Sequence, residues 1–166
     1  MNQRYRKLIM WALYAALFLA ALLVQSVVLG RIRIYGVKLD LLPVVMVCVG
    51  LWTGHESGGL FALISALVWA LTGAEDAALA IVTFTVCAVL SGYLCSAVFS
   101  RRFPPAFLLS LGALLLHEGL LFLLKLYLEG ASWTLFRWVP VTAGLSVLSC
   151  LVLYPLAKII GKVGSN

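Results

Sequence analysis

The segment from Leu8 to Leu29 reads LIMWALYAALFLAALLVQSVVL and contains no charged residue. As an α-helix it would extend for roughly 33 Å, enough to cross a hydrocarbon core of about 30 Å. A cleaved signal peptide is the alternative, because the basic stretch Arg4–Lys7 precedes the segment. Signal peptides have a shorter apolar region and a small-x-small cleavage site, which Leu29-Gly30-Arg31 does not provide. We therefore expect a retained first transmembrane helix.

The composition extends this prediction to the whole chain. Of 166 residues, 64% are hydrophobic and 11% are charged. Soluble domains are about half apolar and a quarter charged, and a chain this short leaves much of its surface exposed. The excess apolar surface must therefore face lipid. We predict an all-α polytopic integral membrane protein whose single membrane domain covers residues 1–166, with no room for a separate soluble catalytic domain.

Turn signals divide the remaining apolar sequence into about six transmembrane helices. Glycines and a charge interrupt the second apolar stretch at Gly54–Gly59, and Pro104-Pro105 separates two later ones. The third span is shorter than the usual ~20 residues, which predicts a tilted helix, local thinning of the bilayer or a partly re-entrant helix. The expected spans are 8–29, 39–54, 58–72, 77–100, 106–128 and 135–160.

The basic residues predict the orientation. With both termini cytoplasmic, seven lie inside and four outside, as the positive-inside rule expects. The inside set is Arg4, Arg6, Lys7, Arg101, Arg102, Lys158 and Lys162, and the outside set is Arg31, Arg33, Lys38 and Arg137. The external loop 30–38 is more basic than the rule expects, so it either meets anionic lipid headgroups or is simply solvated. The net charge of +6 gathers at span ends, which favours membrane lipids and not nucleic acid as partners.

Ionisable and polar groups inside spans are the candidate functional residues, because each is costly in lipid. His117-Glu118 lies mid-way along the fifth span, beside Gly119. The pair contacts a partner or lipid, or else forms an internal hydrogen bond that fixes the bundle. Gln25 has the same two alternatives, and Asp40 is explained by the positive end of the helix that it precedes. A catalytic role for His117 and Glu118 would require a second acid or base at that depth, and none is expected.

No other motif indicates chemistry. Cys48, Cys87, Cys95 and Cys150 fall inside spans without metal-ligand or disulfide spacing, and no nucleotide-binding or nucleophile motif occurs. We therefore expect no enzyme, no metal and no cofactor. Small residues four apart predict ridges for close helix packing, either within the chain or against a partner that includes a second copy. These ridges comprise Ala12, Ala16 and Ala20; Gly50 and Gly54; and Ala62, Ala66 and Ala70.

Four segments together resemble the rod shape-determining MreD family of bacteria. They are Leu22–Leu29 with Ile34–Leu41; the glycine-interrupted hairpin 54–73; Ser91–Leu94 running into Arg101-Arg102, with His117-Glu118 in the next span; and Val139–Val141 leading to Tyr154–Leu156. The chain departs from the family at Lys38-Leu39-Asp40, where proline-aspartate-leucine is expected, and at Trp69-Ala70, where an aspartate is common.

This resemblance implies a non-enzymatic inner-membrane subunit of the cell-wall elongation machinery, which maintains rod shape. It implies direct binding to the single-span protein MreC and, through it, action with RodA, the elongation-specific penicillin-binding protein and MreB. It also implies a fold similar to the substrate-binding subunit of energy-coupling-factor transporters. A vitamin-binding subunit of such a transporter is the alternative. It is suggested by the six short helices and the alanine ridge of the first span, with Tyr35, Trp133 and Trp138 as the available aromatic contacts. A small lipid-modifying enzyme that uses His117 and Glu118 is a third hypothesis, and it does not come from the resemblance.

Overall fold

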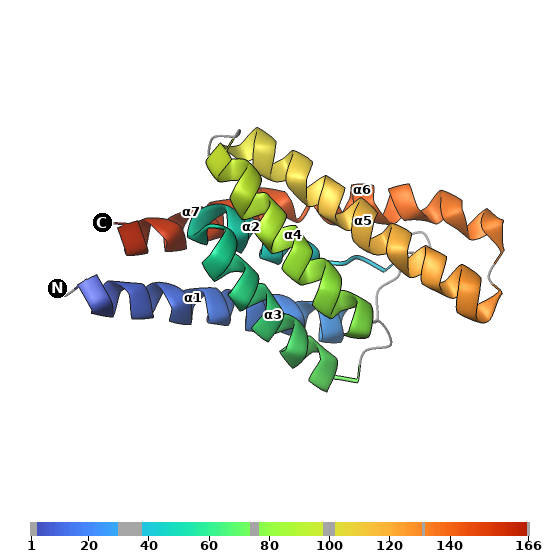
Figure 1. The fold of residues 1–166 in the computed structure, drawn as a ribbon, viewed down its shortest axis with the longest axis horizontal. Coiled ribbons are helices and arrows are strands. Elements are labelled where there is room, and N and C mark those ends of the chain that lie inside the picture. Colours follow the sequence, from blue (N-terminus) through green and yellow to red (C-terminus); the bar gives the residue numbers. More distant parts are fainter. Residues whose placement is uncertain (1–2, 30–37, 74–76, 98–101, 131, 166) are drawn as a thin grey trace.

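In a computed structural model, the residues that the structure describes are 3–29, 38–73, 77–97, 102–130 and 132–165, and they form helices joined by short turns and loops, with no strand among them (Figure 1). The helices form one layered bundle in which consecutive elements pack against each other. In chain order they are α1 (Gln3–Leu23), the π-helical η1 (Val24–Leu29), α2 (Leu42–Thr53), α3 (His55–Leu71), α4 (Ala77–Ala97), α5 (Phe103–Glu129), the 3-10 helix η2 (Trp133–Arg137), α6 (Trp138–Val147) and α7 (Cys150–Ser165).

The helices confirm an all-α membrane protein at the level of length and composition. Three described segments are long and apolar enough to cross a membrane: Gln3–Leu29, Ala77–Ala97 and Phe103–Leu128. A fourth is added if the bent pair Trp133–Val147 and Cys150–Gly164 is one span. The helices α2 and α3 are apolar but shorter. The sequence indicates that the segment 58–72 is unusually short for a span. In the structure, however, α2 with 12 residues is shorter than α3 with 17 residues.

Helix α2 is the centre of the bundle. Every residue from Leu42 to Leu51 is buried, and α1, α3, α4, α5 and α7 all pack around the helix. A helix that is apolar on all sides is stable only where protein or lipid surrounds it completely. Because its neighbours shield α2 from lipid, twelve residues are sufficient here.

The turn between α2 and α3 rests directly on α4. Gly54 has a φ of 88° and ends α2, and α3 begins at the next residue. A Cβ on Gly92 of α4 would lie 2.5 Å from the backbone nitrogen of His55 and 2.6 Å from the carbonyl carbon of Gly54. The predicted ridge residue Gly50 meets α4 in the same way, at Ala88 and Ser91. These glycines therefore serve contacts within the chain, as do the buried Ala62 and Ala66.

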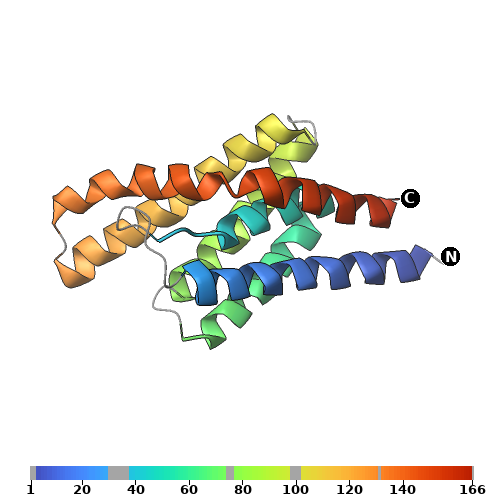
Figure 2. The same cartoon turned by 180° about the vertical axis from the view of Figure 1, so that it is seen from behind.

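The first and last helices lie antiparallel, side by side, with both termini at the same end of the molecule (Figure 2). The Tyr14 hydroxyl donates a hydrogen bond of 3.2 Å to the carbonyl of Ala157, and Met10 packs against Gly164. Helix α1 turns Tyr14, Phe18 and Ala21 toward the bundle. The predicted ridge Ala12, Ala16 and Ala20 lies instead on the exposed side of α1. Ala70, the last residue of the predicted ridge in α3, is half-buried.

The predicted sixth span is divided in the structure. Instead of one helix over 135–160 there are η2, α6 and α7, with a bend of 46° at residues 148–149. Backbone hydrogen bonds between residues three apart replace the α-helical pattern there, from Leu148 N–H to Leu145 and Ser149 N–H to Ser146. The Ser149 hydroxyl also donates to the Ser146 carbonyl at 2.7 Å, a local bond that bends helices.

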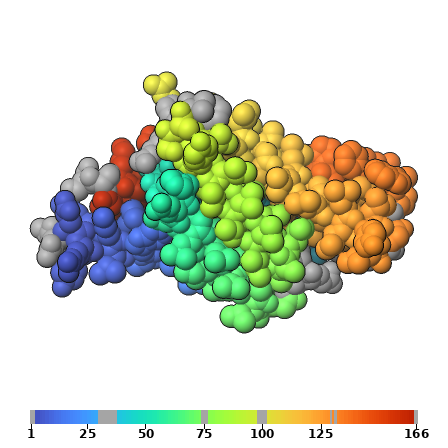
Figure 3. All heavy atoms as spheres, viewed as in Figure 1, coloured from blue at the N-terminus to red at the C-terminus, as the bar shows by residue number. Residues whose placement is uncertain are grey.

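The hairpin formed by α5, η2 and α6 extends past the other helices, at the end opposite the termini (Figure 1). In the space-filling view the same end, in orange at the right, is continuous with α4 and the start of α5 (Figure 3). Much of its surface is apolar, with Leu123, Leu135 and Phe136 about half exposed. A surface of this kind requires lipid or an apolar partner to cover it.

We predict that Gly92→Ala destabilises the protein by about 1–3 kcal/mol, because the added methyl would meet the backbone of the α2–α3 turn. The measurement is thermal unfolding in detergent, monitored by the loss of the monodisperse peak on size exclusion. Gly112→Ala is the matched control, since a Cβ at that position of α5 meets nothing within 4 Å. Equal unfolding temperatures for the two variants would contradict the packing described here.

Candidate functional site

A buried group of polar side chains joins five elements of the bundle. We call Gln25, Asp40, Thr83, His117 and Ser146 the polar cluster. They come from η1, the segment before α2, α4, α5 and α6, respectively. Three of them, Gln25, Asp40 and His117, are candidate residues from the sequence, and the structure brings these three together.

Gln25 caps the start of α2 from a neighbouring helix. Its side-chain oxygen accepts hydrogen bonds from the backbone N–H groups of Leu41 (2.8 Å) and Leu42 (3.2 Å), and its amide nitrogen donates to Asp40 Oδ1 at 2.7 Å. The first N–H groups of a helix have no partner within the helix, and in lipid no water replaces one. Pro43 follows in the first turn and has no N–H to satisfy. Gln25 therefore allows α2 to begin inside the bundle.

Asp40 is the centre of the polar cluster. Besides the bond from Gln25, its Oδ1 accepts from Leu42 N–H at 3.3 Å, and its own N–H donates to Ser146 Oγ at 2.9 Å. The other carboxylate oxygen, Oδ2, lies 3.4 Å from Nε2 of His117. The favourable position before a helix, which the sequence indicates for Asp40, is thus only part of its environment.

The contact between His117 and Asp40 requires a proton. Nε2 faces Oδ2 of the carboxylate, and without a proton between them two lone pairs would repel each other. On the other side of the ring, Thr83 Oγ1 lies 2.8 Å from Nδ1 of His117 and 3.0 Å from the Leu79 carbonyl oxygen. A hydroxyl group can donate or accept, so Thr83 is a partner for either tautomer of His117.

Thr83 and Ser146 are the members of the polar cluster that sequence reasoning missed. Both are buried, at 1% exposure each. Threonine and serine occur throughout apolar helices because their hydroxyl groups bond to the preceding turn, as Thr85 does with Ile81. Nothing in the sequence therefore separates Thr83 from Thr85.

Glu118, the other charged candidate of the fifth span, does not belong to the polar cluster. Consecutive residues of a helix point about 100° apart, so Glu118 lies on a different side of α5 from His117. His117 is fully buried, whereas Glu118 is only half-buried. Of these two residues, His117 is therefore the one whose polar atoms must be satisfied entirely inside the protein.

The arrangement favours a structural role for the polar cluster. Each of its members contacts another member or the start of α2 through the bonds described above. Gln25 is half-buried, and the other four members are buried. Within the described part of the chain, no group of three or more histidine, cysteine, aspartate or glutamate side chains is placed to hold a metal ion. The four cysteines are buried free thiols. The predicted contacts Arg31, Arg33 and Tyr35 lie outside the described residues.

Comparisons of the chain with protein-family models, with curated proteins and with solved structures find no match in any of the three.

We predict that Gln25→Leu lowers the free energy of unfolding by about 1–3 kcal/mol, because the side chain keeps its size but leaves buried donors and an acceptor unsatisfied. The measurement is thermal unfolding in detergent. The neighbouring Ser26→Ala is the control, since Ser26 is exposed and bonds only to Leu23 of its own helix. If both variants unfold like the wild type, Gln25 does not support α2.

We further predict that Asp40 and His117 are energetically coupled. Asp40→Asn and His117→Gln each disturb the shared contact, so the double variant should be more stable than the sum of the two single losses predicts, by about 0.5–3 kcal/mol. A double-mutant cycle on unfolding temperatures and enthalpies measures this coupling. Purely additive losses would show that the 3.4 Å approach carries no interaction.

Proposed function

We propose that this chain is a non-enzymatic subunit of the bacterial cell-wall elongation machinery that binds MreC in the inner membrane and helps to maintain rod shape. In this proposal the protein crosses the membrane about six times, with both termini in the cytoplasm. It acts with RodA, the elongation-specific penicillin-binding protein and MreB through the complex.

The observation that carries this proposal is the convergence of the segments on which the family resemblance rests. The first segment supplies Gln25 and Asp40, the third supplies His117, and all three enter the polar cluster. The second and third segments also meet, where Gly92 supports the turn at Gly54. Short motifs that are scattered along a chain but meet in space act as one structural unit, which strengthens a resemblance that rests on several short motifs.

The arrangement of helix ends supports the proposed topology. The ends at residues 54 and 97–103 lie at the same end of the molecule as the two termini, and those at residues 29, 71–77 and 129–133 lie at the opposite end (Figure 1). The first end carries Arg4, Lys7, Arg102, Lys158 and Lys162. A basic end of this kind belongs on the cytoplasmic side under the positive-inside rule.

A non-enzymatic role agrees with the use of His117. Its two ring nitrogens face Thr83 and Asp40, and the ring is fully buried. A general acid or base must reach the proton that it transfers on a substrate, within about 3 Å or through one water. The side chain is instead placed to hold α4, α5 and the start of α2 together.

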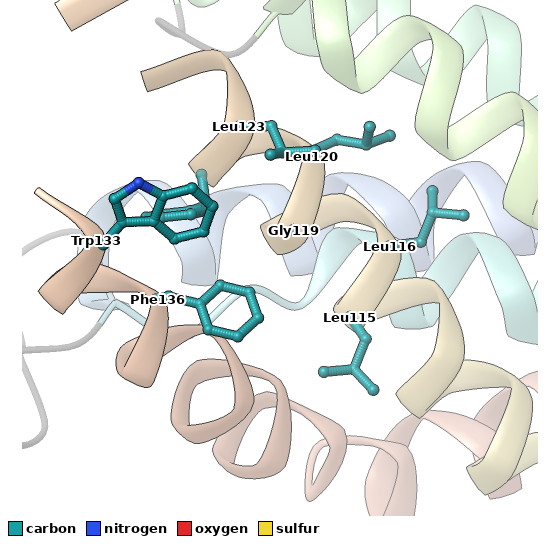
Figure 4. Close-up of a pocket in the computed structure, with 8 residues that line it drawn as sticks. Leu115, Leu116, Gly119, Leu120, Leu123, Trp133 and Phe136 are labelled. Atoms are coloured by element: carbon teal, nitrogen blue, oxygen red, sulfur yellow. The ribbon is translucent and has the colours of Figure 1, made fainter. Parts of the chain in front are cut away.

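The pocket that includes Trp133 gives the vitamin-binding alternative no support (Figure 4). A small-molecule site requires a few polar groups that converge on an apolar pocket. The pocket that includes Trp133 is lined by leucine, phenylalanine, tryptophan and glycine. For this reason we favour the subunit that binds partner proteins. The exposed ridge Ala12, Ala16 and Ala20 is the surface on which two copies of the chain would pack in a homodimer.

We predict that tagged MreC from the same cells co-purifies with this chain in mild detergent, and that depletion of the chain turns rod-shaped cells into rounded ones. An unrelated single-span membrane protein of equal abundance, carrying the same tag, is the control for non-specific capture. Persistence of rods after complete depletion, in a strain without a second copy of the gene, would overturn the proposed function, as would equal recovery of MreC and the control protein.

A further inference from the structure

The first turns of α1 and the last turns of α7 carry one basic surface, although they come from opposite ends of the chain. The two helices pack side by side, and both termini lie at the same end of the molecule (Figure 2). Met10 packs against Gly164, and less than one helical turn separates Lys7 from the first of these residues and Lys162 from the second. The fold therefore joins two sets of cations that the sequence keeps apart.

Four exposed cations make up this surface, which we call the basic surface: Arg4, Lys7, Lys158 and Lys162. The packing of α7 holds its two lysines outside the bundle. They are four residues apart and so share one side of the helix. The side that faces the bundle is fixed, because Ala157 is fully buried and a Cβ added to Gly161 would lie 2.9 Å from the ring of Trp52.

No acidic residue balances these cations on either helix. The described segments Gln3–Leu23 and Cys150–Ser165 contain neither aspartate nor glutamate. At the same end of the molecule Glu56 lies in the first turn of α3, but its side chain is 89% exposed and its carboxylate is 3.9 Å from Nε2 of His55. Like charges on adjacent helices repel each other, so a negatively charged partner would stabilise this end of the bundle.

The apolar neighbours of the cations favour a phospholipid over an acidic segment of a protein. Leu8 follows Lys7 and is 66% exposed, and Ile159 follows Lys158 and is 63% exposed. Tyr5, an aromatic residue of the kind that is enriched at membrane–water interfaces, is 64% exposed. An acidic peptide would complement the charge alone. A phospholipid offers phosphate groups to the cations and acyl chains to the adjoining apolar side chains.

We infer that the basic surface binds the phosphate groups of anionic phospholipids, with cations of both terminal helices contacting the same patch of headgroups. Phosphate accepts charge-assisted hydrogen bonds from ammonium and guanidinium groups alike. Bound phosphate groups also offset the repulsion between α1 and α7. The inference is independent of the proposed role in cell-wall elongation, because it rests on the charge, exposure and packing of these two helices alone.

Native mass spectrometry of the purified full chain tests the inference, with phosphatidylglycerol and phosphatidylcholine of identical acyl chains as probes. The double variants Lys158→Gln/Lys162→Gln and Arg4→Gln/Lys7→Gln each remove two charges from the basic surface. The matched control, Lys125→Gln/Arg137→Gln, removes the same charge from exposed positions toward the opposite end of the molecule. Unfolding temperatures in detergent check that all variants are folded.

We predict that the wild type retains phosphatidylglycerol more strongly than phosphatidylcholine, and that rising salt weakens this preference. Each double variant of the basic surface should retain phosphatidylglycerol about 25-fold less, since one cation near an anionic surface contributes about 1 kcal/mol, a factor of about five. The control should change retention less than about threefold, a fraction of that loss.

Equal losses in the control and in the variants of the basic surface would show that binding follows net charge alone, and would overturn the inference. Equal retention of the two lipids by the wild type would overturn it too. A photo-reactive residue in place of Ile159 that captures a protein in cells, and no lipid, would instead assign the surface to an acidic protein partner.

Discussion

The carboxyl group of Asp40 must be neutralised inside an apolar bundle, and much of the architecture follows from how this is done. An unpaired charge in such surroundings costs several kcal/mol, so Asp40 requires partners from more than one direction. Gln25 approaches from η1 and His117 from α5, while Ser146 of α6 holds the adjacent backbone. Each of these contacts fixes the height of one helix relative to α2.

A second constraint is the short length of α2. A helix of twelve residues cannot span a bilayer unaided, so other helices must enclose it, and its ends must be satisfied by protein instead of water. Gln25 provides this at the first turn. At the last turn, Gly54 reverses the direction of the chain. This turn packs directly against α4 because Gly92 has no side chain at the point of contact. Polar groups at one end and glycines at the other thus solve the same problem.

The sequence predicted the helical membrane class and three members of the polar cluster, because a polar side chain in an apolar run is conspicuous on grounds of solvation alone. It did not predict that Gln25, Asp40 and His117 meet, since that depends on the relative heights of helices far apart in the chain. On grounds of charge the sequence emphasises Glu118 over His117, whereas the packing of α5 buries His117 completely and leaves Glu118 half-buried. The bend near Ser149 arises from local hydrogen bonds that a hydropathy pattern does not register.

The polar cluster also limits how this protein can recognise anything else in the membrane. Its hydrogen-bonding groups are occupied inside the bundle, and much of the outer surface of the hairpin is apolar. Within lipid, apolar surfaces gain little from the hydrophobic effect, and association depends on close packing. A ridge of small side chains such as Ala12, Ala16 and Ala20, which is exposed on α1, suits the close approach of another helix.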